Sequence, residues 1–376
     1  MSSYFSLFVL GKKELKMKSE LSPIERGRLY SQGHEVDRIP VGFISSETAG
    51  YLYGYNVRSS YLDADAIVDI ESRLFEEFCA DGIRVGPGLR GVAETMGAKV
   101  CYPENSICYV SAPAFNSYDE MGALTVLNKR TLSKRMQVNL ESIKRLCDKF
   151  SGIAPVRNDV GGPVSTAAAL RGYDRLLRDF RRNPEEVKRL LSLSVENILE
   201  WVRIVYTECG VAPSFAEPFI SGDLISHAVF EEFAKPALAQ LFSGVKTITG
   251  ASSGLHVCGR SKYIWSDMDS IGVSSLSIDD AESLLEFKTS VGHKMGLGGN
   301  VSPTQVLLLG SPADVHAAVK KALLEGSDNP KGYTLSAGCQ IPVGAPRENL
   351  TAFMEAACTY GKNAQKGALC KGLSLV

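Results

Sequence analysis

The chain has 376 residues, of which 44% are hydrophobic, and a formal net charge of −1. This balance is typical of a soluble globular protein and gives no global electrostatic case for binding nucleic acid or an anionic membrane. No stretch of the sequence reaches the length of a membrane span. Nine cysteines without regular spacing argue against a disulfide framework and predict a reducing, cytoplasmic setting.

The N-terminal segment does not read as a secretory signal. Residues 4–10 are apolar but are followed, rather than preceded, by lysines. We expect residues 1–16 to be a disordered or dispensable extension and residues 17–376 to form one domain. Ser22, Pro23 and Glu25 have the spacing of a helix start with a capping box.

Eight short β-like segments occur along the chain, and each is followed by a segment of helical periodicity. They are residues 41–44, 83–85, 154–157, 214–216, 255–257, 273–278, 294–297 and 333–336. The clearest helical segments are residues 184–206, 230–241, 313–324 and 348–360, and Ser311 caps the third of these. Such alternation predicts an α/β protein with parallel strands, and eight units predict a single (β/α)8 TIM barrel. An open doubly wound sheet is the alternative, but no Gly-x-Gly-x-x-Gly follows the first strand.

One segment interrupts this alternation after the second strand. Residues 99–102 and 107–111 are β-rich and flank the turn-forming residues 103–106. We interpret residues 97–115 as an inserted β-hairpin. The sequence leaves open whether this hairpin shapes the barrel mouth or only covers the surface.

One histidine and two cysteines form a candidate metal site. His256 and Cys258 are two residues apart, so on an extended segment both side chains point the same way, and Cys339 follows about eighty residues later. An imidazole and two thiols suit a tetrahedral zinc. Three ligands from two distant segments favour a catalytic zinc with an exchangeable fourth position. The alternative is a chance grouping in a cysteine-rich chain.

The predicted fold brings these residues to one rim. Active sites of (β/α)8 enzymes lie at the carboxyl ends of the strands. His256 and Cys258 end the fifth predicted strand, Asp279 follows the sixth, and Cys339 follows the eighth. This convergence favours metal binding over coincidence.

Three further polar residues follow predicted strands. Asn158, Glu217 and Asn300 come after strands three, four and seven, where they would orient a substrate or else cap helices. The tyrosines at positions 51, 53 and 55 follow the first strand and would form an aromatic wall or pack on the hairpin. His227 and His293 are interpreted as ordinary surface or core residues.

Several motifs point to a known family. The most specific are residues 255–259 (Leu-His-Val-Cys-Gly), 298–303 (Gly-Gly-Asn-Val-Ser-Pro) and 336–342 (Ser-Ala-Gly-Cys-Gln-Ile-Pro), with support from residues 37–41, 161–163 and 346–350. Together they resemble the uroporphyrinogen decarboxylase superfamily, and more closely its zinc-dependent branch of corrinoid and methylcobalamin methyltransferases. The likeness extends from residue 17 through nearly the whole chain, and the family fold is a (β/α)8 barrel.

The resemblance implies a ligand set and a reaction. His256, Cys258 and Cys339 would bind Zn²⁺, with Asp279 as the chosen fourth ligand and with Asp280, Glu282 and Glu217 as rivals. Asp279 would otherwise be a helix cap. The reaction would move a methyl group between a corrinoid (methylcobalamin) and a small substrate, such as a methyl ether, methylamine, methanol, a thiol or tetrahydrofolate. The chain has no Asp-x-His-x-x-Gly motif, so a small corrinoid-binding protein is the expected partner.

The sequence departs from the decarboxylases at one place. In those enzymes an arginine-rich motif after the first strand meets the carboxylates of the substrate. This chain has no arginine between Arg38 and Arg58. A decarboxylase-like lyase without metal therefore remains only as the alternative function.

Overall fold

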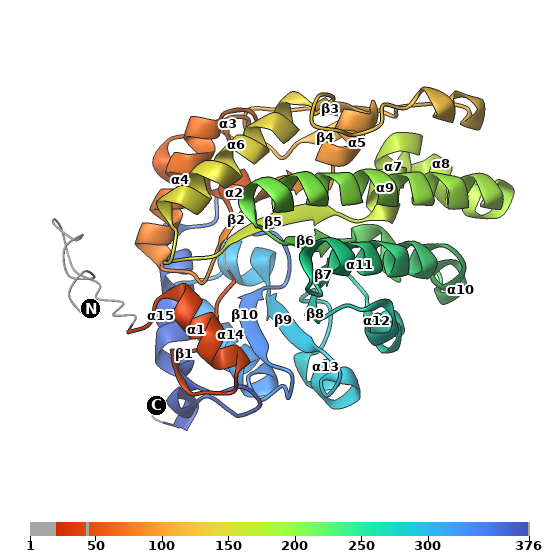
Figure 1. Cartoon of the computed structure of the whole chain (residues 1–376). Helices are drawn as coiled ribbons and strands as arrows, with labels where there is room; N and C mark the ends of the chain where they lie inside the picture. The colour runs from red at the N-terminus through yellow and green to blue at the C-terminus, as the bar shows by residue number, and fades with distance from the viewer. Residues whose placement is uncertain (1–19, 43–44, 375–376) are drawn as a thin grey trace.

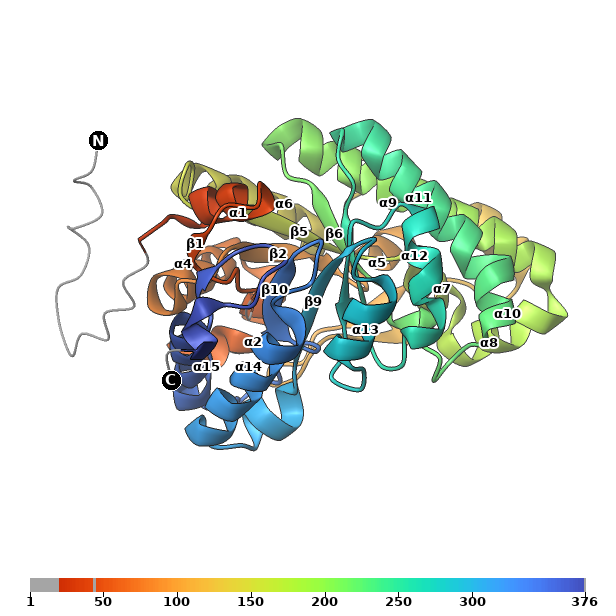
Figure 2. The same ribbon diagram turned by 90° about the horizontal axis from the view of Figure 1, so that it is seen from below.

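The computed structural model describes residues 20–42 and 45–374, so the predicted extension at residues 1–16 lies outside the described residues. Seven parallel strands form a curled sheet in the order β10-β9-β8-β7-β6-β5-β2. The helices lie around its outer side (Figures 1 and 2). The strands are β2 Ile83–Gly88, β5 Val156–Gly161, β6 Pro213–Ala216, β7 Gly254–Val257, β8 Ser275–Ile278, β9 Gly296–Val301 and β10 Tyr333–Ala337. Each overlaps one of the predicted strands.

The α-helices and the remaining elements complete the chain. The helices are α1 Pro23–Ser31, α2 Ser46–Ala49, α3 Ser59–Leu62, α4 Ala64–Phe78, α5 Gly91–Met96, α6 Lys134–Lys149, α7 Pro163–Arg171, α8 Tyr173–Arg182, α9 Pro184–Cys209, α10 His227–Val229, α11 Lys235–Thr249, α12 Trp265–Ile271, α13 Leu284–Val291, α14 Pro312–Gly326 and α15 Arg347–Tyr360. Short 3-10 or π segments are η1 Gly50–Tyr53, η2 Tyr118–Ala123, η3 Pro218–Ile220, η4 Phe230–Ala234, η5 Lys262–Ile264, η6 Pro303–Leu308 and η7 Lys371–Ser374. Two antiparallel pairs lie outside the main sheet: β1 Val36–Arg38 with β11 Lys362–Ala364, and β3 Lys99–Cys101 with β4 Tyr109–Ala112.

The first predicted strand, residues 41–44, is described only at its first two residues, because residues 43–44 lie outside the described residues. Val41 forms a parallel bridge with Leu335 of β10. Gly42 donates its N–H to the Leu335 carbonyl, while Asp81, just before β2, donates its N–H to the Val41 carbonyl. This segment therefore lies between β10 and β2, at the two edges of the curled sheet.

Local capping explains where two helices begin. Ser22 and Glu25 form the predicted capping box at α1, and Ser311 forms a second one with Asp314 at α14. Both pairs satisfy backbone N–H groups that a helix start otherwise leaves without partners. The predictions for these two helix starts are confirmed.

The hydrophobic core lies between the sheet and the helices rather than inside the barrel. Residues alternate along β7, β8 and β10: Leu255, Leu276 and Leu335 are buried, whereas their neighbours keep accessible surface. Because side chains alternate between the faces of a strand, the buried set points to the helices and the accessible set points inward. The inward positions carry small or polar residues, including His256 and Thr334. Bulky branched side chains fill the interior of most barrels of this class.

Candidate metal centre

Three side chains meet at the carboxyl ends of β7 and β10. His256 Nε2 lies 3.2 Å from Cys258 Sγ, and Cys258 Sγ lies 3.4 Å from Cys339 Sγ. The three ligand atoms all lie within 4.8 Å of one another. The parallel sheet thus brings Cys339 to the pair that the sequence placed about eighty residues earlier.

The neighbouring strand fixes the orientation of the His256 ring. Ser277 of β8 is the register partner of His256, and its carbonyl and hydroxyl oxygens lie 3.2 and 3.1 Å from His256 Nδ1. An N–H at Nδ1 donates to this residue, which leaves the lone pair of Nε2 directed at the two sulfur atoms. Metal-binding histidines are generally oriented by such a second hydrogen bond.

The contact between the two thiols shifts their pKa values in opposite directions. The hydrogen bond with Cys258 lowers the pKa of Cys339 to about 4 against the effect of burial, and the His256 ring lowers it further. The same contact raises the pKa of Cys258 well above its usual range, together with burial and the charges of Asp279 and Glu217. One thiolate therefore forms readily next to an imidazole. Thiolate is the form of cysteine that binds metals.

The donor set and its spacing fit zinc. With Zn–N and Zn–S bonds of about 2.0 and 2.3 Å at tetrahedral angles, ligand atoms are separated by roughly 3.5 to 3.8 Å. The N–S and S–S separations of 3.2 and 3.4 Å are close to that range. A zinc ion at this place would require little movement of the three side chains.

The acidic residues after β8 lie near the centre but already have other partners. Asp279 lies outside the 4.8 Å cluster, and its Oδ1 accepts the N–H of Ala281 at 3.0 Å. Glu282 Oε1 accepts the backbone N–H groups of residues 261 and 262. Burial raises the pKa of Asp280, with a further contribution from Asp279.

Glu217 follows β6 as predicted, and its carboxylate holds the start of α7. Its two oxygens accept the N–H groups of Val164 and Ser165 at 2.8 Å, and the Ser165 hydroxyl donates to the same carboxylate. The side chain is fully buried, and burial raises its pKa to about 7. A Cβ on Gly162 would lie 2.3 Å from Glu217 Oε2, so this close approach requires glycine.

The two asparagines were expected after their strands but lie within them. Asn158 is a fully buried residue of β5, and its Oδ1 accepts the indole N–H of Trp201 on α9 at 3.2 Å. Among the described residues, the Asn158 Nδ2 group is buried without a hydrogen-bond partner. Since Asn158 lies inside β5, its placement in a loop was wrong. Asn300 is in β9 and donates from Nδ2 to the carbonyls of Asp279 and Glu282 at 3.0 and 2.7 Å. It therefore holds the turn beside the centre.

The hydroxyl groups of the three tyrosines after the first strand have defined partners. Tyr53 and Tyr55 donate to Glu77 and Asp69 on α4, at 2.9 and 3.0 Å. The Tyr51 hydroxyl donates to a carbonyl at residue 345, just before α15. These hydrogen bonds do not test the aromatic wall or the packing against residues 97–115, and both stay predictions.

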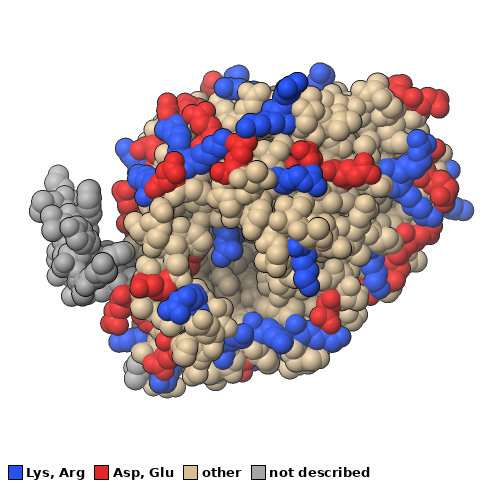
Figure 3. Space-filling view, viewed as in Figure 1, with Lys and Arg blue, Asp and Glu red and all other residues tan. Residues whose placement is uncertain are grey.

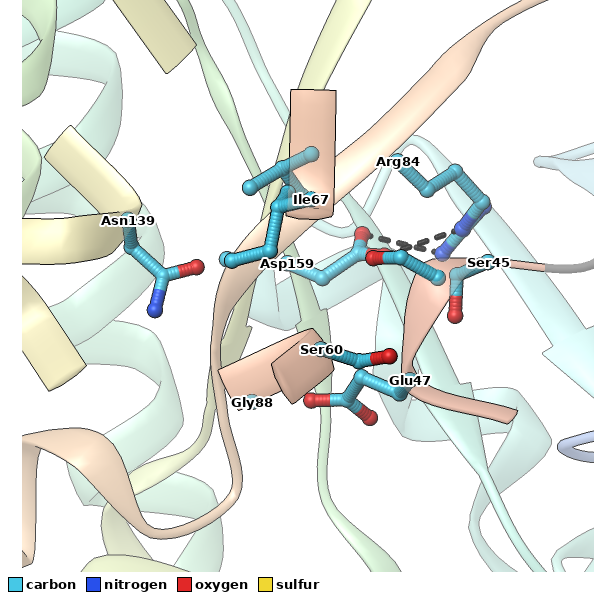
Figure 4. A pocket seen from close by; sticks show the side chains of 11 residues that line it. Ser45, Glu47, Ser60, Ile67, Arg84, Gly88, Asn139 and Asp159 are labelled. Carbon is cyan, nitrogen blue, oxygen red and sulfur yellow. Dashed lines mark hydrogen bonds and ion pairs between the residues drawn. The ribbon is translucent and has the colours of Figure 1, made fainter. Parts of the chain in front are cut away.

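Sequence reasoning missed an ion pair beside the centre. Glu47 of α2 pairs with the buried guanidinium of Arg135 at 2.6 Å and accepts from Gln340, the residue after Cys339, at 3.0 Å. A cavity of about 50 Å³ adjoins Glu47 and is also lined by Ser60 and Asp159 (Figure 4). The sequence offered one sign of this ion pair, the charged residue Glu47 three positions after the first predicted strand.

The remaining predicted histidines lie elsewhere. His293 is exposed. His227 lies 3.3 Å from Asp267 in a surface group with Glu231, and the Lys235 ammonium contacts both carboxylates at 2.7 Å. The Lys235 ammonium already neutralises charge on both carboxylates, as a bound metal ion would. We therefore interpret this group as a surface salt-bridge network.

The structure is an α/β fold with a curled parallel sheet, and a cluster of one histidine and two cysteines that could hold a metal lies at the carboxyl ends of its strands. Comparison with known proteins identifies the family. The model of the uroporphyrinogen decarboxylase (URO-D) family matches residues 23–360, and the chain belongs to this family. In the described residues, no helix has the length and apolar character needed to cross a membrane.

Relatives with assigned names are similar over most of the chain. The methylated-thiol–coenzyme M methyltransferase of Methanosarcina mazei is 22% identical over 343 residues, or 90% of each chain. The methylcobamide:CoM methyltransferase MtaA of Methanosarcina barkeri is 24% identical over 336 residues, covering 88% of this chain and 95% of the relative. A solved methyltransferase structure from Methanosarcina mazei has a TM-score of 0.78 at 23% identity and covers 89% of this chain and 98% of its own, which supports the fold.

Proposed function

We propose that this chain is a zinc-dependent methyltransferase that moves a methyl group between a corrinoid and a small substrate. The observation that carries the proposal is the convergence of His256, Cys258 and Cys339 at the end of the barrel where such folds have their active sites. The names of the relatives support it, since they are methyltransferases that act with coenzyme M. The corrinoid would come from a separate small protein.

The proposed zinc ligands are His256, Cys258 and Cys339, with Asp279 as the fourth. Asp279 is close enough for its charge to raise the pKa of Cys258, although its Oδ1 accepts a backbone N–H. When bound, zinc would act as a Lewis acid toward a thiol or a methyl-bearing heteroatom. The family barrel would be closed as (β/α)8, with β3 and β4 as an insertion after the second strand.

The protein's own groups would prepare the site for this chemistry. Ser277 holds His256 with Nε2 toward the sulfur atoms, and the low pKa of Cys339 supplies a thiolate at neutral pH. Glu217 and Asn300 remain proposed substrate-orienting residues because they hold α7 and the turn at residues 279–282 beside the centre. For Asn158, which faces Trp201, we propose an indirect contribution through packing.

The place of the decarboxylase arginine motif argues against the alternative lyase. Glu47 stands shortly after the first strand segment, and it forms an ion pair with the buried guanidinium of Arg135. A substrate with several carboxylates would meet a carboxylate there rather than a free cation. This supports methyl transfer over decarboxylation of a porphyrinogen.

Metal analysis combined with an activity assay tests the proposal. We expect about one zinc per chain, with loss of both zinc and methyl transfer from methylcobalamin to a panel of thiols in Cys339→Ala. Cys370→Ala, which removes a buried cysteine outside the centre, is the matched control and should keep both. Protein that stays metal-free when zinc is supplied, or a Cys339→Ala variant that retains zinc and activity, would overturn the proposal.

A further inference from the structure

A second group of charged side chains faces the barrel interior, at the amino ends of β2 and β5. Arg84 and Arg157 are the second residues of these strands and are direct register partners. Asp159, two residues after Arg157, points to the same face. The inward residues keep accessible surface, and Figure 3 shows a hollow in the face viewed in Figure 1, with a basic side chain inside it.

The carboxylates near this position already have partners. Arg84 Nε and one terminal nitrogen bind the two oxygens of Asp159, both at 2.9 Å, and the Ser214 hydroxyl also donates to Asp159. Asp81, the next carboxylate toward the amino ends, pairs with the guanidiniums of Arg26 and Arg38. Both carboxylates therefore act on Arg157 only through their charge, without a hydrogen bond or ion pair.

Arg157 has no such partner. In the part of the chain that the structure describes, its side chain makes no hydrogen bond or ion pair. Its Cγ and Nε lie 3.7 and 3.8 Å from where a Cβ on Gly82 would be, so the side chain extends across the start of β2. Arg157 keeps accessible surface, so a ligand can reach its guanidinium from solvent. Two guanidiniums on register partners repel each other, and an anion between them would relieve that repulsion.

We propose that the barrel interior at Arg84 and Arg157 binds a small oxyanion, such as sulfate, phosphate, a sulfonate or a carboxylate. Guanidinium groups match planar or tetrahedral oxyanions through paired N–H donors. All the donors of Arg157 are available, and Arg84 keeps one terminal nitrogen that does not contact Asp159. Because the charges of Arg84 and Asp159 cancel, the guanidinium of Arg157 leaves the pair of arginines with one net positive charge.

This site is separate from the metal centre. Arg157 lies four residues before Gly161, which is in register with Ala216 and, through it, with His256. Four residues correspond to about 13 Å along a strand. Anion binding is therefore independent of the proposed methyl transfer and should persist in Cys339→Ala.

Anion titration of the full-length protein tests the proposal. Sulfate, phosphate, acetate and ethanesulfonate would be titrated calorimetrically at constant ionic strength in a sodium chloride background. We expect saturable binding of at least one of them in the wild type, weakened at least tenfold in Arg157→Gln and partly restored in Arg157→Lys. Tighter binding of the organic anions than of sulfate would identify an organic ligand, and the reverse order an inorganic one.

The matched control is Arg189→Gln on α9, an exposed arginine paired with Glu186, which should bind as the wild type does. Circular dichroism would establish that each variant is folded. Unchanged affinity in Arg157→Gln, or no saturable binding of any of the four anions, would overturn the proposal.

Discussion

Replacing Glu71 by glutamine should stabilise the protein at neutral pH and leave its stability in mild acid nearly unchanged. Glu71 lies on α4, is 2% exposed, and accepts the N–H of Ser46 at 2.6 Å. Burial raises its pKa from 4.5 to about 7. A raised folded-state pKa means that the folded protein holds the proton more tightly than the unfolded chain. The contribution of this group is therefore greatest below pH 4.5 and declines as the pH rises toward 7.

The pKa shift of Glu71 sets the size of the expected change in the free energy of unfolding. A difference of roughly 2.5 pKa units corresponds to a loss of about 3 kcal/mol above pH 7, and a glutamine, which does not ionise, avoids that loss while keeping an acceptor for Ser46. Urea unfolding followed by far-UV circular dichroism at pH 5, 6, 7 and 8 would measure the difference. Glu76→Gln, on the same helix but 65% exposed, is the control. A difference between wild type and Glu71→Gln that is the same at pH 5 and pH 8 would refute the reasoning.

Three other substitutions have defined outcomes. Ser277→Ala removes one of two oxygens that hold His256, so the zinc dissociation constant should rise about tenfold in a competition assay with a chelator, and an unchanged value would count against this role. Gly162→Ala places a Cβ against the Glu217 carboxylate and should lower the melting temperature, whereas an unaltered melting curve would contradict the contact. Asp81→Asn removes the carboxylate that pairs with the buried guanidinium of Arg38 and one of the two that pair with Arg26, which keeps Asp37. It should destabilise the fold by about 3 kcal/mol in urea unfolding, and a loss under 1 kcal/mol would show that the pairs matter little.

The sequence predicted the positions of most strands and the convergence of His256, Cys258 and Cys339 because both depend on local or topological rules. Glycine, proline and hydrophobic runs mark the strands, and parallel strands bring their carboxyl ends together wherever the ligands lie in the chain. Asn158 escaped this reasoning because its place inside β5 is stabilised by Trp201, 43 residues away. A partner at that separation leaves no pattern near the asparagine itself.

The pair of Glu47 and Arg135 was missed for a similar reason. The two residues are 88 positions apart and meet only because α2 and α6 lie on the same side of the barrel. The expected strand at residues 41–44 is described only at its first two residues, where Val41 forms a parallel bridge with Leu335.

Among the described residues, the segment around Val41 joins the two edges of the curled sheet through few backbone hydrogen bonds. Regions with few such bonds open at lower free energy than the strands in the middle of a sheet. Amide hydrogen exchange should therefore be faster at Gly42 than at Leu276 in β8, which lies between two fully paired strands. The sheet would then open transiently at the segment between β10 and β2. Water would enter there first, rather than between the packed helices.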